Sequence, residues 1–144
     1  MAKILGIDLG TTNSAIAYVD KQRRPVVIPN GQGDRITPSV IYFPPDADEE
    51  PLVGRAAKHM RTSDPGRAVA CVKREMGNKS FDYRFGDGDD DHADPSQLSS
   101  LILQKMIRDA EKRLDGPIDR AVITVPAYFH DPERNSTREA AHLA

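Results

Sequence analysis

The sequence contains one cysteine, Cys71, and no tryptophan among its 144 residues. A single thiol cannot form an internal disulfide, so the stability of the fold must come from packing, as expected in a reducing compartment. No apolar run reaches the roughly 18 to 20 residues of a membrane-spanning helix, and the N-terminus does not have the basic and then apolar layout of a secretory signal. The sequence therefore predicts a soluble, cytoplasmic protein with no membrane partner.

An excess of charge of one sign is also missing. The chain has 20 Lys and Arg against 22 Asp and Glu, so no overall field exists to gather a polyanion, and no nucleic-acid partner is expected. A content of 38% hydrophobic and 29% charged residues is typical of a globular protein. A chain of this length forms a single domain with a real core.

Metal-ligand patterns are missing as well. The four histidines show no pairing at zinc-ligand spacing, so a zinc site is not expected. The acidic run from Asp87 suggests a calcium loop at first sight. However, His92 stands where such a loop needs glycine, and Leu98 stands where it needs glutamate. The acidic segment from Asp87 to Asp94 is therefore interpreted as a solvated surface loop.

The first part of the chain has the pattern of short strands. Two apolar runs, Ile4 to Leu9 and Ser14 to Val19, flank a small polar break and predict a β-hairpin. Pro25 to Ile28 adds a third strand, which makes a β-meander. After a loop rich in Gly, Asp and Thr, Val40 to Phe43 predicts another strand, and the only candidate internal boundary lies between residues 39 and 40.

The middle of the chain alternates short elements. Leu52 to Gly54 predicts a strand, Arg55 to Arg61 a short helix, and Ala68 to Lys73 an extended buried run. The clearest helix begins after Asp94, with proline at its first position and a glutamine at its third. Its apolar stripe consists of Leu98, Leu101, Ile102, Met106, Ala110 and Leu114.

The last part of the chain predicts one more strand and one more helix. Ala121 to Val125 is a nearly continuous β-branched run, which favours a central strand covered on both faces. Asp131 is the predicted N-cap of a helix that runs from Glu133 to Ala144 and has no stop signal. We therefore expect an α/β fold, and a chain that is a fragment cut within its last helix.

The strongest chemical signal is the segment from Ile4 to Ser14. Asp8 ends a strand, and the following turn can direct backbone N–H groups and two hydroxyls at phosphate oxygens; its residues are Gly10, Thr11, Thr12 and Asn13. A carboxylate at Asp8 is suited to hold Mg²⁺, usually through water. An ordinary hairpin, whose Gly, Thr and Asn serve only the turn, explains the same residues.

Further segments carry a family resemblance. The string from Ile7 to Ser14, the segment from Asn30 to Ser39, Val53-Gly54-Arg55-Ala56-Ala57, Lys73-Arg74, and Val122 to Phe129 resemble motifs of the seventy-kilodalton heat-shock chaperone family in order and spacing. The resemblance covers Lys3 to Ala144. The chain departs from the family pattern at Glu75-Met76, His130 and Asn135-Ser136, and none of these departures touches the phosphate-binding turn.

The resemblance implies a ribonuclease-H-like, actin-like ATPase fold, of which this chain is part of lobe one. Residues 1–39 and 116–144 are then the core subdomain, and residues 40–115 are an inserted peripheral subdomain. ATP or ADP with Mg²⁺ occupies a cleft between two lobes. The implied phosphate-binding residues are Gly10, Thr11, Thr12 and Asn13, and Asp8 is the implied metal-binding residue.

The resemblance also assigns three residues outside this turn. Lys73 is the implied catalytic residue, which helps to place the attacking water. From its residue type alone, a lysine in an apolar run is interpreted as a snorkelling surface side chain. Pro126 and Arg134 are the implied pair that passes the nucleotide state to a peptide-binding domain, and a strand-ending proline and a solvated arginine explain them equally from residue type.

The implied full-length protein is an ATP hydrolase that binds unfolded polypeptides through a peptide-binding domain absent from this chain. Its implied partners are a J-domain co-chaperone and a nucleotide exchange factor. A sugar or acetate kinase is the second hypothesis, although Thr37-Pro38-Ser39 and Val125 to Phe129 favour the chaperone. The third is a stable but inactive folding unit or a partner-binding fragment, because the fragment lacks half of the cleft. We then expect it to bind nucleotide weakly or not at all, and its exposed apolar surface suits a dimer.

Overall fold

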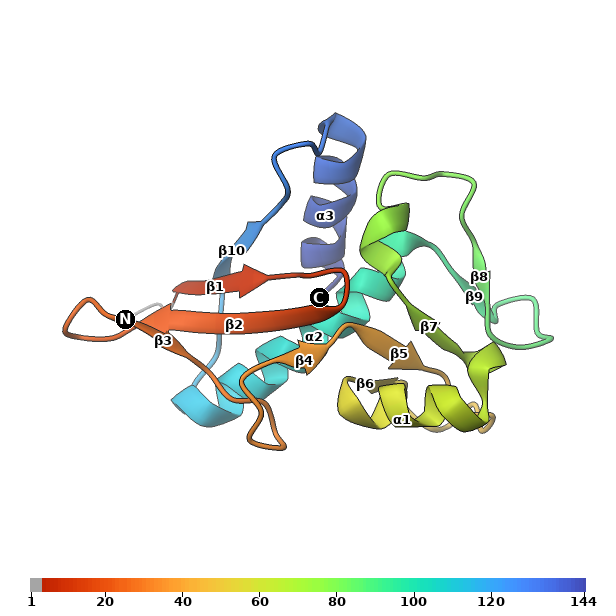
Figure 1. Ribbon diagram of the computed structural model, residues 1–144, viewed down its shortest axis with the longest axis horizontal. Helices are drawn as coiled ribbons and strands as arrows, with labels where there is room; N and C mark the ends of the chain where they lie inside the picture. Colours follow the sequence, from red (N-terminus) through yellow and green to blue (C-terminus); the bar gives the residue numbers. More distant parts are fainter. Residues whose placement is uncertain (1–3) are drawn as a thin grey trace.

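The computed structural model describes residues 4–144 and begins with the predicted β-meander. Strands β1 (Ile4–Asp8), β2 (Asn13–Val19) and β3 (Pro25–Val27) are joined in antiparallel pairs. Strand β10 (Arg120–Thr124) lies on the other side of β1 and runs parallel to it, which gives the order β10-β1-β2-β3 (Figure 1). The short strand β4 (Thr37–Pro38) pairs with the start of β2.

The prediction that β10 is central and covered on both faces is wrong for this chain. Within residues 4–144, β10 pairs only with β1 and forms the edge of the sheet. Its Val122 side chain is 62% exposed. The apolar β-branched composition identified a strand correctly, but composition reports only what a strand can bury and not which neighbours it has.

A second sheet follows the boundary predicted between residues 39 and 40. Its order is β6-β5-β7, with β5 (Val40–Tyr42) in the middle, β6 (Leu52–Val53) on one side and β7 (Ala68–Ala70) on the other. Helix α1 (Arg55–Ser63) packs against this sheet and buries Ala57 between itself and the strands (Figure 1). A 3-10 turn, η1 (Pro65–Arg67), leads from α1 into β7.

The extended run predicted from Ala68 to Lys73 is only half extended. Strand β7 stops at Ala70, and Cys71 adopts a left-handed conformation with φ of 60°. A 3-10 turn, η2 (Val72–Glu75), follows and carries Lys73. The turn directs the Val72 side chain into the core, where it is 2% exposed. The apolar sequence pattern thus predicted the burial of this residue correctly but not its backbone conformation.

A two-stranded ribbon and the long helix α2 (Pro95–Leu114) complete this part of the chain. The ribbon pairs β8 (Tyr83–Arg84) with β9 (His92–Ala93). The predicted start of α2 is confirmed: Gln97 N–H donates to Asp94 Oδ1 at 2.8 Å, and Asp94 N–H donates to Gln97 Oε1 at 2.9 Å. This reciprocal capping box satisfies two backbone donors that a helix start would leave unpaired.

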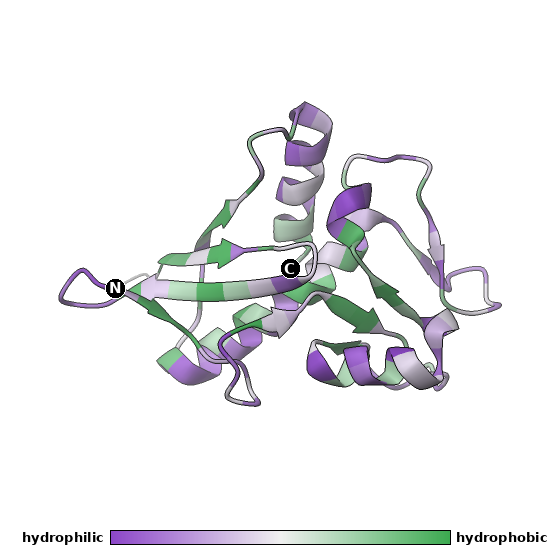
Figure 2. Cartoon of the chain, viewed as in Figure 1, coloured by the Kyte–Doolittle hydropathy of each residue, from purple (hydrophilic) through white to green (hydrophobic). Residues whose placement is uncertain are grey.

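Helix α2 joins the two sheets into one hydrophobic core. It contacts β2, β5, β6 and η2, and it packs along α3 (Asp131–Leu143) (Figure 1). The hydrophobic colour in Figure 2 gathers on the strands, while the loops and much of α1 are hydrophilic. Fully buried apolar side chains from three elements meet in the core: Leu5, Ile7, Ile41, Leu98 and Leu103.

The predicted N-cap of α3 is wrong by one residue. His130 is the N-cap, and Asp131 lies in the first helical turn. The side chain of Glu133 sets this start, because its Oε2 accepts a hydrogen bond from His130 N–H at 3.0 Å. None of the helices in residues 4–144 combines the length and the apolar character that crossing a membrane would require.

Tyr42 is a polar group inside the second sheet. Its side chain is 4% exposed, and its hydroxyl donates to Asp64 Oδ2 at 3.1 Å. Burial raises the pKa of Tyr42 above its ordinary value of 10.0, and the Asp64 carboxylate raises it further. Burial raises the pKa of Tyr83 in the same direction.

These tyrosines predict a loss of stability in alkali. A pKa raised by folding means that the native state holds its proton more tightly, so stability falls as pH rises through the raised value. The free energy of unfolding should therefore decline above about pH 10. Tyr42→Phe should reduce this decline, with Tyr83 accounting for part of the remainder. Urea unfolding at a series of pH values measures it, and an unchanged slope in Tyr42→Phe would contradict the assignment.

The capping box predicts the effect of a second substitution. Asp94→Ala removes the acceptor for Gln97 N–H and should lower the free energy of unfolding by about 1 kcal/mol. Asp89→Ala, in the exposed loop before α2, is the control and should stay close to the parent. Chemical denaturation compares them, and equal effects of the two substitutions would show that the box does not stabilise α2.

Candidate functional site

The turn between β1 and β2 begins where the Asp8 strand ends. A Cβ atom on Gly10 would lie 1.9 Å from the backbone oxygen of Asn13, a distance that no side chain can occupy. Glycine is therefore required here by close approach of the backbone and not by a positive φ. The turn folds tightly on itself, and the Asn13 carbonyl occupies the space that a side chain at position 10 would need.

Two buried serine hydroxyls form hydrogen bonds with the backbone of this turn. Gly10 N–H donates to Ser14 Oγ at 3.2 Å, and Ser39 Oγ donates to the Gly10 carbonyl at 2.8 Å. The two hydroxyl oxygens lie 2.8 Å apart. Because the Ser39 hydroxyl already donates its one proton to the Gly10 carbonyl, the Ser14 hydroxyl must donate to Ser39 Oγ. The three hydrogen bonds form a closed ring. Ser39 N–H also donates to the Thr12 carbonyl at 2.9 Å.

The remaining residues of the turn face outward. Asp8, Thr12 and Asn13 are exposed, and Thr11 is half-buried. Their hydroxyl, amide and carboxylate groups suit a phosphorylated ligand with Mg²⁺, because this ion commonly takes one or two protein carboxylates together with phosphate oxygens and water. The fit of the site therefore rests on the chemistry of these exposed groups. No three His, Cys, Asp or Glu side chains in residues 4–144 converge as a metal site, and at this turn Asp8 would be the carboxylate that serves the ion.

The parallel pairing of β1 and β10 brings a distant segment beside Asp8. Asp8 stands opposite Thr124 in the register, and Thr124 Oγ1 donates to the Ile7 carbonyl at 3.4 Å. Both strands end at this edge of the sheet, so the segment that contains Pro126 continues from the same edge as the Gly10 turn. Chains leaving the carboxyl ends of parallel strands are a recurrent location for ligand sites.

Lys73 reaches this edge from η2. Its half-buried side chain borders a small cavity together with Leu9, Thr124 and Phe129. Lys73 Nζ lies 5.9 Å from the centre of the Phe129 ring, at the outer limit of a cation–π contact. The structure thus brings Lys73 to the residues that follow β1 and β10.

Phe129 connects the other predicted residues to Lys73. Phe129 N–H donates to the Pro126 carbonyl at 3.1 Å, and Arg134 Nε donates to the Phe129 carbonyl at 3.1 Å. The Phe129 side chain is 6% exposed. Pro126 and Arg134 therefore hold the backbone of the residue whose ring borders Lys73.

Sequence reasoning missed the supporting roles of Ser14, Ser39 and Phe129. All three residues lie within the segments that resemble the family, but no local pattern marks any of them as a structural partner. Ser14 and Ser39 are 25 residues apart, and their contact arises only because β4 pairs with β2. No spacing rule for helices or strands predicts such a contact.

Comparison with known proteins identifies the family. A family model described as Hsp70 protein matches residues 4–144. The chain therefore belongs to the Hsp70 family. It is 46% identical over 142 residues to the chaperone protein DnaK of Halobacterium salinarum, in strains R1 and NRC-1. The match covers 99% of this chain and 22% of each relative, so the chain spans about a fifth of their length.

The closed turn predicts that Gly10 does not tolerate a side chain. Gly10→Ala should lower the free energy of unfolding by about 1 to 3 kcal/mol, because the backbone must shift to clear the Asn13 oxygen. Gly66→Ala is the matched control, since a Cβ there meets nothing within 4 Å. Thermal and urea unfolding compare the two variants. Equal stability of both would mean that the turn is looser than its hydrogen bonds indicate.

Proposed function

We propose that this chain is the N-terminal part of the ATPase domain of a seventy-kilodalton heat-shock chaperone. In this proposal the fold is ribonuclease-H-like and actin-like, and the chain is part of lobe one. Residues 1–39 and 116–144 form its core subdomain, and residues 40–115 are the inserted subdomain. Membership of the Hsp70 family supports this assignment over a sugar or acetate kinase.

The observation that carries the proposal is the convergence at one edge of the first sheet. Asp8, the Gly10 turn and the segment after Thr124 follow the ends of two parallel strands, and Lys73 borders the same edge. Phosphoryl transfer depends mainly on positioning and on neutralising charge at the phosphate oxygens. Backbone groups, hydroxyls, a carboxylate for a metal and one lysine are the parts that such a reaction requires.

The residues of the turn bind the phosphates in this proposal. The side chains of Thr11, Thr12 and Asn13 donate hydrogen bonds to the phosphate oxygens. The Asp8 carboxylate would hold Mg²⁺, and the ion would neutralise phosphate charge. Gly10 N–H itself donates to Ser14 Oγ, so this glycine contributes the tight turn that presents these side chains and not a donor.

Lys73 orients the attacking water in this proposal. Its ammonium group donates a hydrogen bond to the water oxygen and offsets negative charge that builds on the transferred phosphoryl group. The Phe129 ring lies 5.9 Å from the ammonium group, at the outer limit of a cation–π contact. Arg134 and Pro126 are hydrogen-bonded to the Phe129 backbone. In this proposal the nucleotide state passes from Lys73 through Phe129 to these two residues and from them to a peptide-binding domain.

The full-length protein would then hydrolyse ATP and bind unfolded polypeptides, with a J-domain co-chaperone and a nucleotide exchange factor as partners. The chain alone carries one side of the cleft. Most contacts to the nucleotide would come from parts of the full-length protein outside this chain, because the chain covers 22% of the length of its DnaK relatives. We therefore propose that this chain by itself binds nucleotide weakly or not at all.

Calorimetry with Mg-ATP tests the chain alone. Wild type and the Asp8→Ala, Lys73→Ala double variant should both show no binding tighter than about 100 µM, which corresponds to roughly 5.5 kcal/mol. Micromolar binding by wild type that the double variant loses would contradict the proposed half-site and would make lobe one sufficient.

A chimera tests the site itself. Residues 4–144 replace the matched segment of the Halobacterium salinarum DnaK, which restores the full length of a relative. Lys73→Ala should lower ATP hydrolysis by about 10²-fold or more with nucleotide affinity little changed. Lys58→Ala, an exposed lysine on α1, is the control. Equal rates in the two variants would remove Lys73 from the mechanism.

A further inference from the structure

Met76 is the residue that follows η2, and it is buried between two helices. Its side chain is 4% exposed. Ser99 Oγ, from α2, donates a hydrogen bond to its sulfur at 3.3 Å, and Ser136 Oγ, from α3, lies 3.7 Å from the same sulfur. A buried methionine packs well without polar partners, so the convergence of two hydroxyls on one thioether is a specific arrangement.

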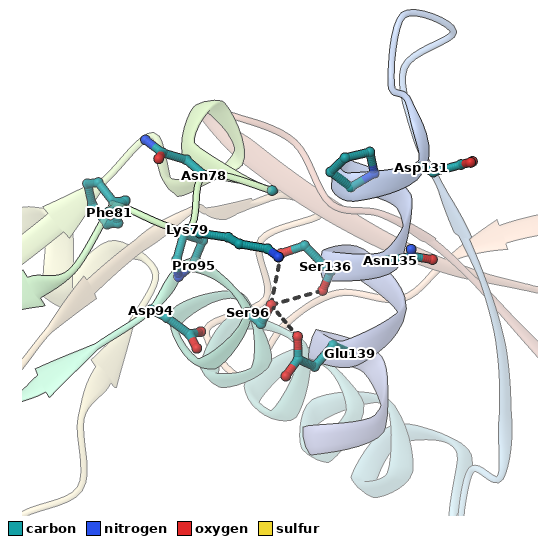
Figure 3. A pocket seen from close by; sticks show the side chains of 12 residues that line it. Asn78, Lys79, Phe81, Asp94, Pro95, Ser96, Asp131, Asn135, Ser136 and Glu139 are labelled. Atoms are coloured by element: carbon teal, nitrogen blue, oxygen red, sulfur yellow. Dashed lines mark hydrogen bonds between the residues drawn. The ribbon is translucent and has the colours of Figure 1, made fainter.

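Ser99 Oγ is the closer of the two hydroxyls to the Met76 sulfur. Ser136 Oγ also lies 2.8 Å from Ser96 Oγ, which is itself 3.1 Å from Glu139 Oε2 (Figure 3). If Ser96 donates to the carboxylate, which is the stronger bond, Ser136 donates to Ser96 and has no proton left for the sulfur. The hydrogen bond from Ser99 to Met76 does not depend on how the protons of Ser96 and Ser136 are arranged.

The backbone beside Met76 also lies close against α3. Gly77 has φ of 79°, and a Cβ on it would lie 3.0 Å from Glu133 N and 3.1 Å from the Pro132 carbonyl carbon. A side chain at this position would separate the chain from the first turn of the helix. The segment that ends η2 is therefore fixed to α2 by the Met76 sulfur and to α3 by contact at Gly77.

Lys73 depends on this attachment. The turn η2 is four residues long, and Met76 N–H donates to the Lys73 carbonyl at 3.4 Å, a long and weak bond. A single 3-10 turn has little rigidity of its own. Met76 and Lys73 also border the same small cavity, so the methionine forms part of the immediate surroundings of the lysine.

We propose that Met76, held by Ser99 of α2, is a positioning residue that sets the place of Lys73 relative to α2. This inference rests on the proposed role of Lys73 in hydrolysis. A shift of α3, which also carries Arg134, would then move the η2 turn as well as Phe129. The lysine would follow α3 from two sides, through the contact at Gly77 and through the Phe129 ring.

Methyl NMR of the chain itself tests the thioether contact. With ¹³C-methyl methionine, Ser99→Ala should shift the Met76 methyl resonance and leave that of Met106 in place. Met106, in α2, is equally buried at 2% exposure and serves as the internal reference. A Met76 resonance that does not move would overturn the proposed anchor, whatever the activity of any longer protein.

Kinetics of the chimera test the positioning role. Met76→Leu keeps the side-chain volume and removes the sulfur acceptor, and Met106→Leu makes the same change elsewhere in the core. Met76→Leu should lower the single-turnover rate of ATP hydrolysis about three- to tenfold while the Kd for ATP stays within about twofold. Met106→Leu should leave both values unchanged.

The controls separate this inference from the proposed function. If Lys73→Ala abolishes hydrolysis but Met76→Leu behaves like Met106→Leu, the positioning role is wrong and the function of Lys73 stands. If Lys73→Ala hydrolyses ATP at the parent rate, the proposed function of the lysine is wrong and the kinetic part of the inference falls with it. Both leucine substitutions are also made in the 144-residue chain, where their thermal unfolding midpoints should agree within about 4 °C, the shift that roughly 1 kcal/mol produces in a chain of this size.

Discussion

The parallel pairing of β1 with β10 is the constraint on which the candidate site depends. It places Asp8 opposite Thr124 and makes the Gly10 turn and the Pro126 segment leave the sheet at the same edge. Parallel strands cannot be joined by a short turn, so the chain between them must cross over. The second sheet and α2 occupy this connection, and η2 brings Lys73 back to the edge where the two strands end.

Buried polar contacts between distant segments then set the details of this edge. Ser14 and Ser39 close a ring of hydrogen bonds under Gly10, and Arg134 holds the backbone of Phe129. Each contact joins elements that the hydrophobic core brings near but does not orient. Apolar packing has little directional preference, whereas a buried hydroxyl has one proton and a defined set of acceptors. Directional bonds of this kind hold the exposed groups of the turn in one arrangement.

The sequence predicted those elements of the fold that depend on residues close together in the chain. The capping box at Asp94 needed only four residues, and the antiparallel meander needed only alternating apolar runs. The edge position of β10 and the left-handed conformation of Cys71 depend on tertiary contacts that a short stretch of sequence does not contain. Family resemblance supplied the candidate site, which residue types alone left open. The departures at Met76 and Ser136, 60 residues apart in the sequence, proved to be neighbours.

The register of β1 against β10 also determines when the site can form during synthesis. Its partners, from Ile4 with Arg120 to Asp8 with Thr124, are separated by 116 residues. Contacts at such separation form slowly, because a long loop must close before they contribute stability. The meander of β1, β2 and β3 is synthesised early, but β10 arrives much later. During that interval one side of β1 has unpaired backbone groups, and an unpaired strand can associate with another chain.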